Sequence, residues 1–346
     1  MKLGFQLIMT TQVSPKINSL GDWASLAFKK YFYKTLKHEA EVLKDQDPEQ
    51  LHQMRIGMRR LRFAAKGFRP VVALPKAAKD QRIGKIAHCL GGLRDLDVLL
   101  EALENQYKPN LPTSEQVELD KALQKLLKQR HQAFKKVQKI LGHQSYLMYK
   151  QKFQEWLDNP IYKDVSQLPI QGVLPDLLLP EISQLFLHSG WLVGVEKENL
   201  ETSDNHNFLL QKTNSKYQVI KINNDISAIN ISDAEEERLH SLRKEVKRVR
   251  YQMSLFTEFY GSTYEAYLKD MKELQEYLGD IQDSAIIRKF LENTWHTNIE
   301  KVLPNLVMQL KHSREKALRK WQVLQRRYLN IQVRQNFRSE LLRPLK

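Results

Sequence analysis

Cysteine is nearly missing from this sequence of 346 residues, which contains only Cys89. A lone cysteine excludes a disulfide within the chain and fits a reducing compartment, so we expect a cytoplasmic protein. No apolar run approaches the roughly 18 residues that a membrane-spanning helix needs, and we expect no membrane partner. The apolar start, residues 1–9, is short and lacks the cleavage site of a secretory signal.

Glycine and proline are also scarce, at 13 and 12 residues. Long stretches without either, with apolar residues at heptad and 3.6-residue spacing, predict an all-α fold. The expected helices cover about 22–44, 48–70, 76–106, 114–141, 144–157, 176–193, 233–259, 263–279, 283–295 and 303–330. One segment, about 200–231, is rich in Asn, Ser and Thr. Its β-prone run 217–222 and the run 208–210 predict a small irregular or β-hairpin insertion.

Acidic residues are too few to balance the basic ones. The sequence has 55 Lys and Arg against 40 Asp and Glu, a formal net charge of +15. Such an excess indicates a polyanionic partner, and composition alone leaves nucleic acid, an anionic membrane surface and a phosphate polymer open. A basic protein that binds nothing in particular also stays open until the charge is shown to be concentrated.

An internal repeat shows where the charge is concentrated. Residues 51–68 (LHQMRIGMRRLRFAAKGF) match residues 239–256 (LHSLRKEVKRVRYQMSLF) at an offset of 188 positions. The same offset aligns residues 90–95 (LGGLRD) with 278–283 (LGDIQD), and residues 130–136 match 314–320 at an offset of 184. Three matches in the same order predict a duplicated helical unit. We divide the chain into an N-terminal segment 1–21, a first half 22–190, a linker or insertion 191–231 and a second half 232–346.

In each copy an apolar seam runs beside a basic stripe. The seam consists of Leu51, Met54, Met58, Leu61, Ala65 and Phe68 in the first copy, and of Leu239, Leu242, Val246, Val249, Met253 and Phe256 in the second. The stripe, one residue further along, consists of His52, Arg55, Arg59, Arg62 and Lys66, and of His240, Arg243, Lys247 and Arg250. Like charges at these spacings repel, so an ordinary solvated face mixes signs. A guanidinium stripe instead suits phosphate oxygens, because each guanidinium can donate two parallel bonds.

The histidines and aspartates of the repeat have two interpretations each. His52 and His240 are either core histidines bonded to the backbone or donors to phosphate. Asp95 and Asp283 orient the arginines or cap a helix, which we favour over metal ligation, because a metal centre usually needs several converging carboxylates. The sequence has no His-x-x-x-His pair and no His/Cys cluster, so we expect no metal and no cofactor.

These residues resemble the CHAD family, the conserved histidine α-helical domain. Its pattern His-x-x-Arg-x-x-x-[Arg/Lys]-Arg-x-Arg-[Phe/Tyr] occurs at 52–63 and at 240–251, and Leu-Gly-x-x-Arg-Asp occurs at 90–95. The resemblance covers about residues 22–340. It implies two four-helix bundles related by a pseudo-two-fold axis around a basic central channel, with long-chain inorganic polyphosphate as the ligand. The Glu-x-Glu-x-Lys motif of the CYTH domains often fused to this family is missing, which indicates a stand-alone CHAD protein.

The resemblance assigns the ligand contacts residue by residue. Binding is implied for His52, Arg55, Arg59, Arg60, Arg62, His240, Arg243, Lys247, Arg248 and Arg250, with Lys66 extending the first stripe. Less secure matches from another helix are Arg130, Lys135, Arg314 and Arg319. We therefore expect a non-catalytic polyphosphate-binding protein, and its association with polyphosphate granules stays open.

Three alternatives remain. A nucleic-acid binder is less favoured, because the stripes carry few aromatic residues beyond Phe63 and Tyr251 and show no recognition motif. A polyphosphate-processing enzyme lacks a Walker loop and a carboxylate cluster in this sequence, so we expect no catalytic residues. A helical scaffold whose charge serves only solubility would bind no polyanion at all. Oligomeric state and protein partners are left open.

Overall fold

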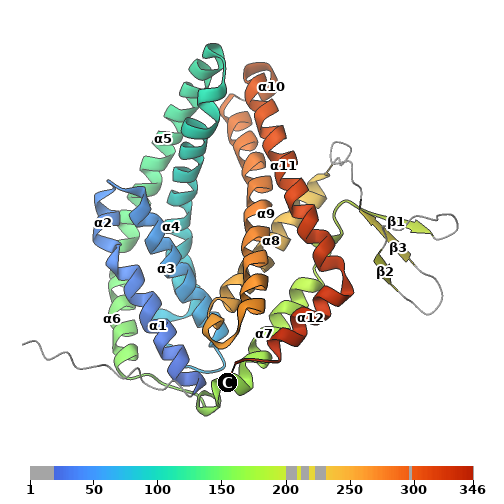
Figure 1. The fold of residues 1–346 in the computed structure, drawn as a ribbon. Coiled ribbons are helices and arrows are strands. Elements are labelled where there is room, and N and C mark those ends of the chain that lie inside the picture. Colours follow the sequence, from blue (N-terminus) through green and yellow to red (C-terminus); the bar gives the residue numbers. More distant parts are fainter. Residues whose placement is uncertain (1–18, 200–208, 212–217, 223–230, 296–297, 346) are drawn as a thin grey trace, which may run out of the picture.

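A computed structural model describes residues 19–199, 209–211, 218–222, 231–295 and 298–345 of the chain. Nearly all of these residues are helical, which confirms the predicted all-α class (Figure 1). The predicted N-terminal segment 1–21 lies almost wholly outside the described residues.

The long helices form two groups that follow one another along the chain (Figure 1). The first group comprises α1 (Leu20–Lys37), α2 (Glu39–Lys44), α3 (Pro48–Gly67), α4 (Asp80–Glu101), α5 (Thr113–Leu141) and α6 (Gln144–Asp158). The second comprises α7 (Ile170–Phe186), α8 (Asp233–Met253), α9 (Ser262–Trp295), α10 (Ile299–Val302), α11 (Pro304–Leu329) and α12 (Ile331–Leu341). We call the two groups the first and the second half of the molecule.

The helices of each half pack in the same order. In the first half α3 packs between α1 and α4, and α4 packs on α5; in the second, α8 packs between α7 and α9, and α9 packs on α11. The repeat helices α3 and α8 contact each other where the halves meet. Helix α7 also packs on α12, so it lies with the second half, whereas the sequence division at residue 190 grouped it with the first.

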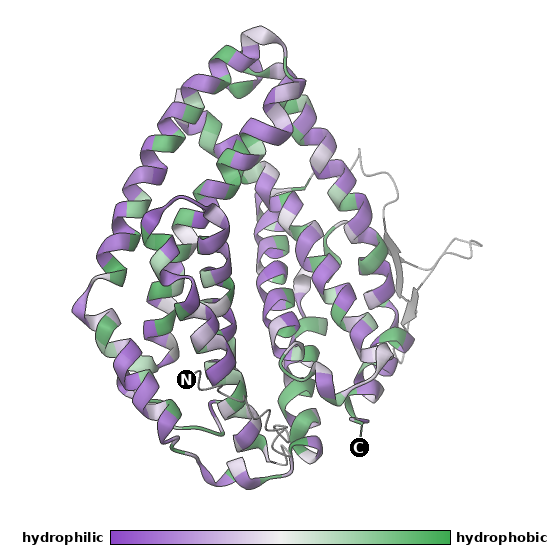
Figure 2. Cartoon of the chain, turned by 60° about the vertical axis from the view of Figure 1, so that its left-hand side comes forward, coloured by the Kyte–Doolittle hydropathy of each residue, from purple (hydrophilic) through white to green (hydrophobic). Residues whose placement is uncertain are grey.

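The starts of the repeat helices follow from their sequences. Asp47 caps α3 by accepting a hydrogen bond from the backbone N–H of Glu49, and Pro48 occupies the first helical position, where no N–H is needed. Ser232 and Glu235 form a capping box at the start of α8. Every seam position of both copies is at most 6% exposed. Figure 2 shows polar and apolar residues alternating around the long helices, as expected for amphipathic helices.

Several helix limits differ from the sequence prediction. The two helices expected at 263–279 and 283–295 are one helix, α9, because Gly279 makes room for the side chain of Arg243 and does not end the helix. The helix expected at 22–44 is divided at His38 into α1 and α2. Helix α7 begins at Ile170 and contains both Pro175 and Pro180. Helix α12 was not predicted.

The predicted hairpin is present as part of a small sheet. Strand β2 (Leu209–Gln211) pairs antiparallel with β3 (Gln218–Ile222), as predicted, while the residues that join the two strands, 212–217, lie outside the described part of the chain. Strand β1 (Val195–Asn199) pairs with the other edge of β3, giving the order β1-β3-β2. In Figure 1 the sheet projects from the second half.

Two apolar clusters join the halves. The larger one contains the seams of α3 and α8 and the aromatic residues packed behind them. The smaller one lies at the far ends of α4, α5, α9 and α11 and includes Leu103, Leu126, Leu291 and Leu306, all at 0% exposure. Beside it the buried carboxylate of Glu115 accepts three hydrogen bonds of 2.6–3.1 Å from Asn305 and Leu306 at the start of α11. A carboxylate stabilises this helix end, where backbone N–H groups lack partners.

Candidate functional site

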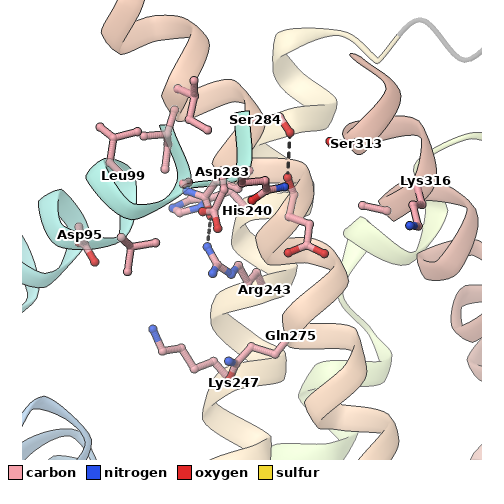
Figure 3. A pocket seen from close by; sticks show the side chains of 18 of the residues that line it. Asp95, Leu99, His240, Arg243, Lys247, Gln275, Asp283, Ser284, Ser313 and Lys316 are labelled. Carbon is pink, nitrogen blue, oxygen red and sulfur yellow. Dashed lines mark hydrogen bonds between the residues drawn. The ribbon is translucent and has the colours of Figure 1, made fainter. Parts of the chain in front are cut away.

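A polar cavity of about 680 Å³ lies between the two apolar clusters. Its walls come from α3 and α4 of the first half and from α8, α9 and α11 of the second. In Figure 3, Arg243 and Lys247 project side by side from α8, with Asp95 on α4 and Lys316 on α11 around them. Both copies of the basic stripe therefore meet at one cavity.

Positive charge dominates the cavity wall. The lining cations are Arg55, Arg59, Arg243, Lys247, Lys316 and Lys320. The acidic residues of the wall are Asp95, Asp280 and Asp283. His240 also lines the cavity, and its Nδ1 atom is buried with no hydrogen-bond partner among the described residues. Six basic side chains thus face three acidic ones, which leaves an excess of positive charge that suits an anionic ligand.

The first arginine of each repeat lies across a glycine of the following helix. Arg55 donates to Asp95 over 2.8 Å, and a Cβ atom at Gly91 would be 3.6 Å from its Nε. Arg243 donates to Gln282 over 2.7 Å, and a Cβ atom at Gly279 would be 2.8 Å from its Nη2. Gly279 therefore leaves the space that the guanidinium of Arg243 occupies, whereas at Gly91 a Cβ atom would make only an ordinary van der Waals contact with Arg55.

The next basic position brings the two halves together. Arg59 of α3 donates to the hydroxyl of Tyr251 on α8 over 3.2 Å. The ring of Tyr251 stacks on Phe63, with centroids 4.8 Å apart and planes 14° from parallel. The aromatic residue that ends each copy of the motif therefore packs against its counterpart and positions Arg59 beside the cavity.

Lys247 occupies the position in the second copy that Arg59 occupies in the first. Burial lowers the pKa of its ammonium group to about 7, and the nearby positive charges of Arg59, Arg243 and Arg55 add to this effect. Asp95 opposes the shift but is already engaged by Arg55. An anion in the cavity would relieve this repulsion, because it supplies the charge that the wall lacks.

The two predicted structural aspartates differ in their contacts. Asp95 forms the ion pair with Arg55, as expected for a residue that orients an arginine. Asp283 faces Arg243 through space, while the hydrogen bond of Arg243 goes to Gln282. Burial raises the pKa of Asp283. Arg243 opposes this shift, and Asp280 and Asp95 add to it. Protonation of Asp283 would therefore make the cavity still more positive.

Four predicted binding arginines instead make contacts within their own halves. The guanidinium of Arg60 lies over the ring of Tyr31 on α1, 5.8 Å from its centroid, and Arg248 pairs with Glu181 on α7 over 2.8 Å. Like Arg248, the other two arginines have carboxylate partners. Arg130 donates to Asp45 and Asp97, and Arg314 donates to Glu236 over 2.5 Å. These side chains do not line the cavity, because partners in their own bundle hold them elsewhere.

The other predicted binding residues lie outside the cavity wall. His52 is half-buried, and burial together with Arg94 lowers its pKa. The guanidinium of Arg250 lies 4.8 Å from the ring centroid of Tyr251. The remaining four, all exposed, are Arg62, Lys66, Lys135 and Arg319.

One face of α11 was missed by the sequence reasoning. Ser313, Lys316, Ala317 and Lys320 all line the cavity. They follow the spacing i, i+3, i+4, i+7, which places residues on one side of a helix. Arg319, which was chosen instead of its neighbour Lys320, points about 100° away. The periodicity of α11 could have identified the correct lysines.

The described residues contain no group of three or more His, Cys, Asp or Glu side chains that could hold a metal ion. None of the described helices has the length and apolar character to cross a membrane.

The pattern of the CHAD domain matches residues 26–292. The chain belongs to the CHAD domain family. Among solved structures, PptA from Streptomyces chartreusis has a similar fold, with a TM-score of 0.60 at 12% identity over 88% of this chain and 99% of that chain. The CHAD domain from the plant Ricinus communis gives a TM-score of 0.52 at 22% identity over 94% of each chain. At such identities the likeness shows the fold alone. No curated protein sequence matches this CHAD protein.

Proposed function

We propose that this CHAD protein binds inorganic polyphosphate in the cavity between its halves and does not cleave it. The observation that carries the proposal is the convergence of Arg55 and Arg59 from α3 with Arg243 and Lys247 from α8 on one cavity. The family to which the chain belongs is known for binding polyphosphate, which supports this choice of polyanion.

The charge of the site is suited to a dense polyanion. Arg59 and Lys247 repel one another strongly enough to contribute to the lowered pKa of Lys247. A phosphate chain would place negative charge between them and accept hydrogen bonds from each side. Every contact of this kind releases counterions, so the affinity should fall steeply with salt concentration.

Nucleic acid fits the cavity less well. Sequence-tolerant binding of single strands uses exposed aromatic rings on which bases stack. The two aromatic residues of the motif, Phe63 and Tyr251, stack on each other, and Tyr251 is only 4% exposed. Tyr107, the aromatic residue of the cavity wall, is 5% exposed. A phosphate polymer needs no such platform.

The test is calorimetry with polyphosphates from tripolyphosphate to long chains, with single-stranded DNA as a competitor, at about 150 mM salt. The double variant Arg59→Glu/Lys247→Glu should lose binding, because it replaces two central cations with carboxylates. The matched control is Lys128→Glu/Lys139→Glu, which changes the net charge equally on the exposed side of α5. This control should retain binding within about threefold.

Other outcomes would overturn the proposal. Equal loss in both double variants would indicate binding by overall charge, and unchanged binding in Arg59→Glu/Lys247→Glu would exclude the cavity. Tighter binding of DNA than of polyphosphate would make the protein a nucleic-acid binder. Phosphate release in the presence of Mg²⁺ or Mn²⁺ that the cavity variant abolishes would make it an enzyme. Far-ultraviolet circular dichroism should show that the variants keep their helices.

A further inference from the structure

The cavity is closed at both ends by apolar packing. At one end Phe63 and Tyr251 fill the gap between α3 and α8. One turn further on, a Cβ atom at Gly67 would be only 2.2 Å from Nε2 of Gln252, so the two helices are in close contact there. At the other end lies the apolar cluster around Leu103 and Leu291. A polyanion longer than the cavity therefore has to continue over the surface of one of the halves.

The surface next to the closed α3–α8 contact is basic in the first half. Arg62 follows Arg59 by one turn, and its Cζ lies 3.3 Å from the position of a Cβ atom at Gly84 on α4. This contact places the exposed Lys66 of α3 near the start of α4, where Lys85 and His88 are also exposed. In the described part of the chain neither Lys66 nor Lys85 forms an ion pair.

The matching surface of the second half lacks this excess of positive charge. At the offset of 188 positions, Ser254 replaces Lys66, Glu273 replaces Lys85 and Glu276 replaces His88. At the same offset Asp280, which lines the cavity, replaces Gly92. Glu273 and Glu276 are each 3.9 Å from a lysine one turn earlier on α9, namely Lys269 and Lys272. These ion pairs leave no excess positive charge for a phosphate chain.

We propose that a polyphosphate chain longer than the cavity continues over the α3–α4 face of the first half, where Lys66, Lys85 and His88 form an extension of the binding site. This inference rests on the proposed function. The α9 face of the second half offers the chain no excess positive charge, so the path lies on one half only, although both halves carry the repeat. The one-sided extension makes the protein prefer long chains to short ones, because tripolyphosphate would occupy the cavity alone.

The test compares two double variants at about 150 mM salt, Lys66→Glu/Lys85→Glu in the first half and Lys269→Glu/Lys272→Glu in the second. Each pair is exposed and changes the net charge equally. The first should weaken binding of long-chain polyphosphate at least about tenfold and lower the salt dependence by about two phosphate contacts, because two cations no longer meet phosphates. Its affinity for tripolyphosphate should stay unchanged. The second should leave both affinities within about threefold.

The outcomes separate this inference from the proposed function. If the wild-type protein binds neither tripolyphosphate nor long chains, the proposed function is wrong. If it binds both but Lys66→Glu/Lys85→Glu keeps the wild-type affinity for long chains, the one-sided path is wrong. The path is also wrong if Lys269→Glu/Lys272→Glu weakens binding of long chains as much as Lys66→Glu/Lys85→Glu does. The milder pair Lys66→Gln/Lys85→Gln removes positive charge without adding negative charge. It should also weaken binding of long-chain polyphosphate, but by a smaller factor. The reciprocal variant Glu273→Lys/Glu276→Lys should strengthen binding of long chains.

Discussion

Matched arginines of the two halves contact corresponding helices through different chemistry. Arg60 lies over the ring of Tyr31 on α1, whereas Arg248 pairs with Glu181 on α7, the helix that precedes the repeat helix of its own half. Arg130 is held by two carboxylates and Arg314 by one. The position of a side chain in the repeat thus determines which way it points, while the residue it meets there differs between the halves.

The comparison separates two kinds of basic residue that look alike in sequence. Arg59 and Arg60 are neighbours, but one step along a helix turns a side chain by about 100°. Arg59 consequently faces the other half, and Arg60 faces its own bundle. The cations that converge on the cavity can bind a ligand, and those that point backward stabilise the packing of each half.

Breaking the buried ion pairs of Arg130 in the first half should have the largest effect, and this effect is on the free energy of unfolding. Arg130 holds Asp97, which is 6% exposed, over 2.7 Å, so Arg130→Met would leave a buried carboxylate without its partner. We expect a loss of about 3 kcal/mol in the free energy of unfolding. The matched change Arg314→Met breaks a pair with side chains that are 29% and 34% exposed and should cost about 1 kcal/mol. Urea unfolding of both variants measures the difference.

Polyphosphate binding should survive in both of these variants, because neither arginine lines the cavity. A loss of affinity in stably folded Arg130→Met would restore Arg130 as a ligand contact. Equal destabilisation by the two changes would contradict the distinction between buried and half-exposed partners. The double change Arg130→Met/Asp97→Asn should recover part of the lost stability, since it removes the stranded charge.

The apolar framework could be predicted from the sequence because its signal is local. Heptad spacing places Leu51, Met58 and Phe68 on one side of α3, and burying that side requires no knowledge of the partner helix. The same holds for the seam of α8, and the capping box at Ser232 is equally local. The predicted helix limits were wrong where tertiary contacts decide them. At Gly279 the glycine accommodates Arg243 within a continuous helix.

The candidate site was only partly predictable for the same reason. Periodicity identifies a basic stripe, but which of its residues reach the cavity depends on the neighbouring helix and on close approaches such as that of Arg243 to Gly279. Arg130 and Arg314 match in sequence, yet the carboxylates that hold them are distant in the chain. Lys316 and Lys320 enter the cavity only because α11 packs on α9, a contact that no local pattern specifies.

The pair formed by Arg59 and Lys247 should make binding depend on pH. Arginine stays charged, whereas Lys247 has a pKa of about 7, lowered by burial and by Arg59, Arg243 and Arg55 against the opposing effect of Asp95. Bound phosphate favours the protonated amine, so binding takes up a proton at pH values above 7. The affinity should therefore fall as pH rises, by at most about tenfold per pH unit.

Calorimetry between pH 7.5 and 9.5 would measure this dependence, since phosphate groups with a pKa of about 6 are already ionised there. Lys247→Arg should flatten the profile, because the cation then no longer titrates. Lys316→Arg, at another lysine of the cavity wall, should keep the wild-type slope. A profile that is equally steep in Lys247→Arg would show that the titrating group lies elsewhere.

The smallest effect should come from the two aspartates, and its sign tests their role. Asp95, 68% exposed in its side chain, is paired with Arg55, whereas Asp283 faces Arg243 without that bond. If a carboxylate mainly competes with phosphate, Asp95→Asn and Asp283→Asn should each strengthen polyphosphate binding by about threefold, because a charge a few ångströms from the ligand is removed. If Asp95 is needed to orient Arg55, Asp95→Asn should weaken binding while Asp283→Asn still strengthens it. Since Gln282 already holds Arg243 over 2.7 Å, we expect no such loss at Asp283.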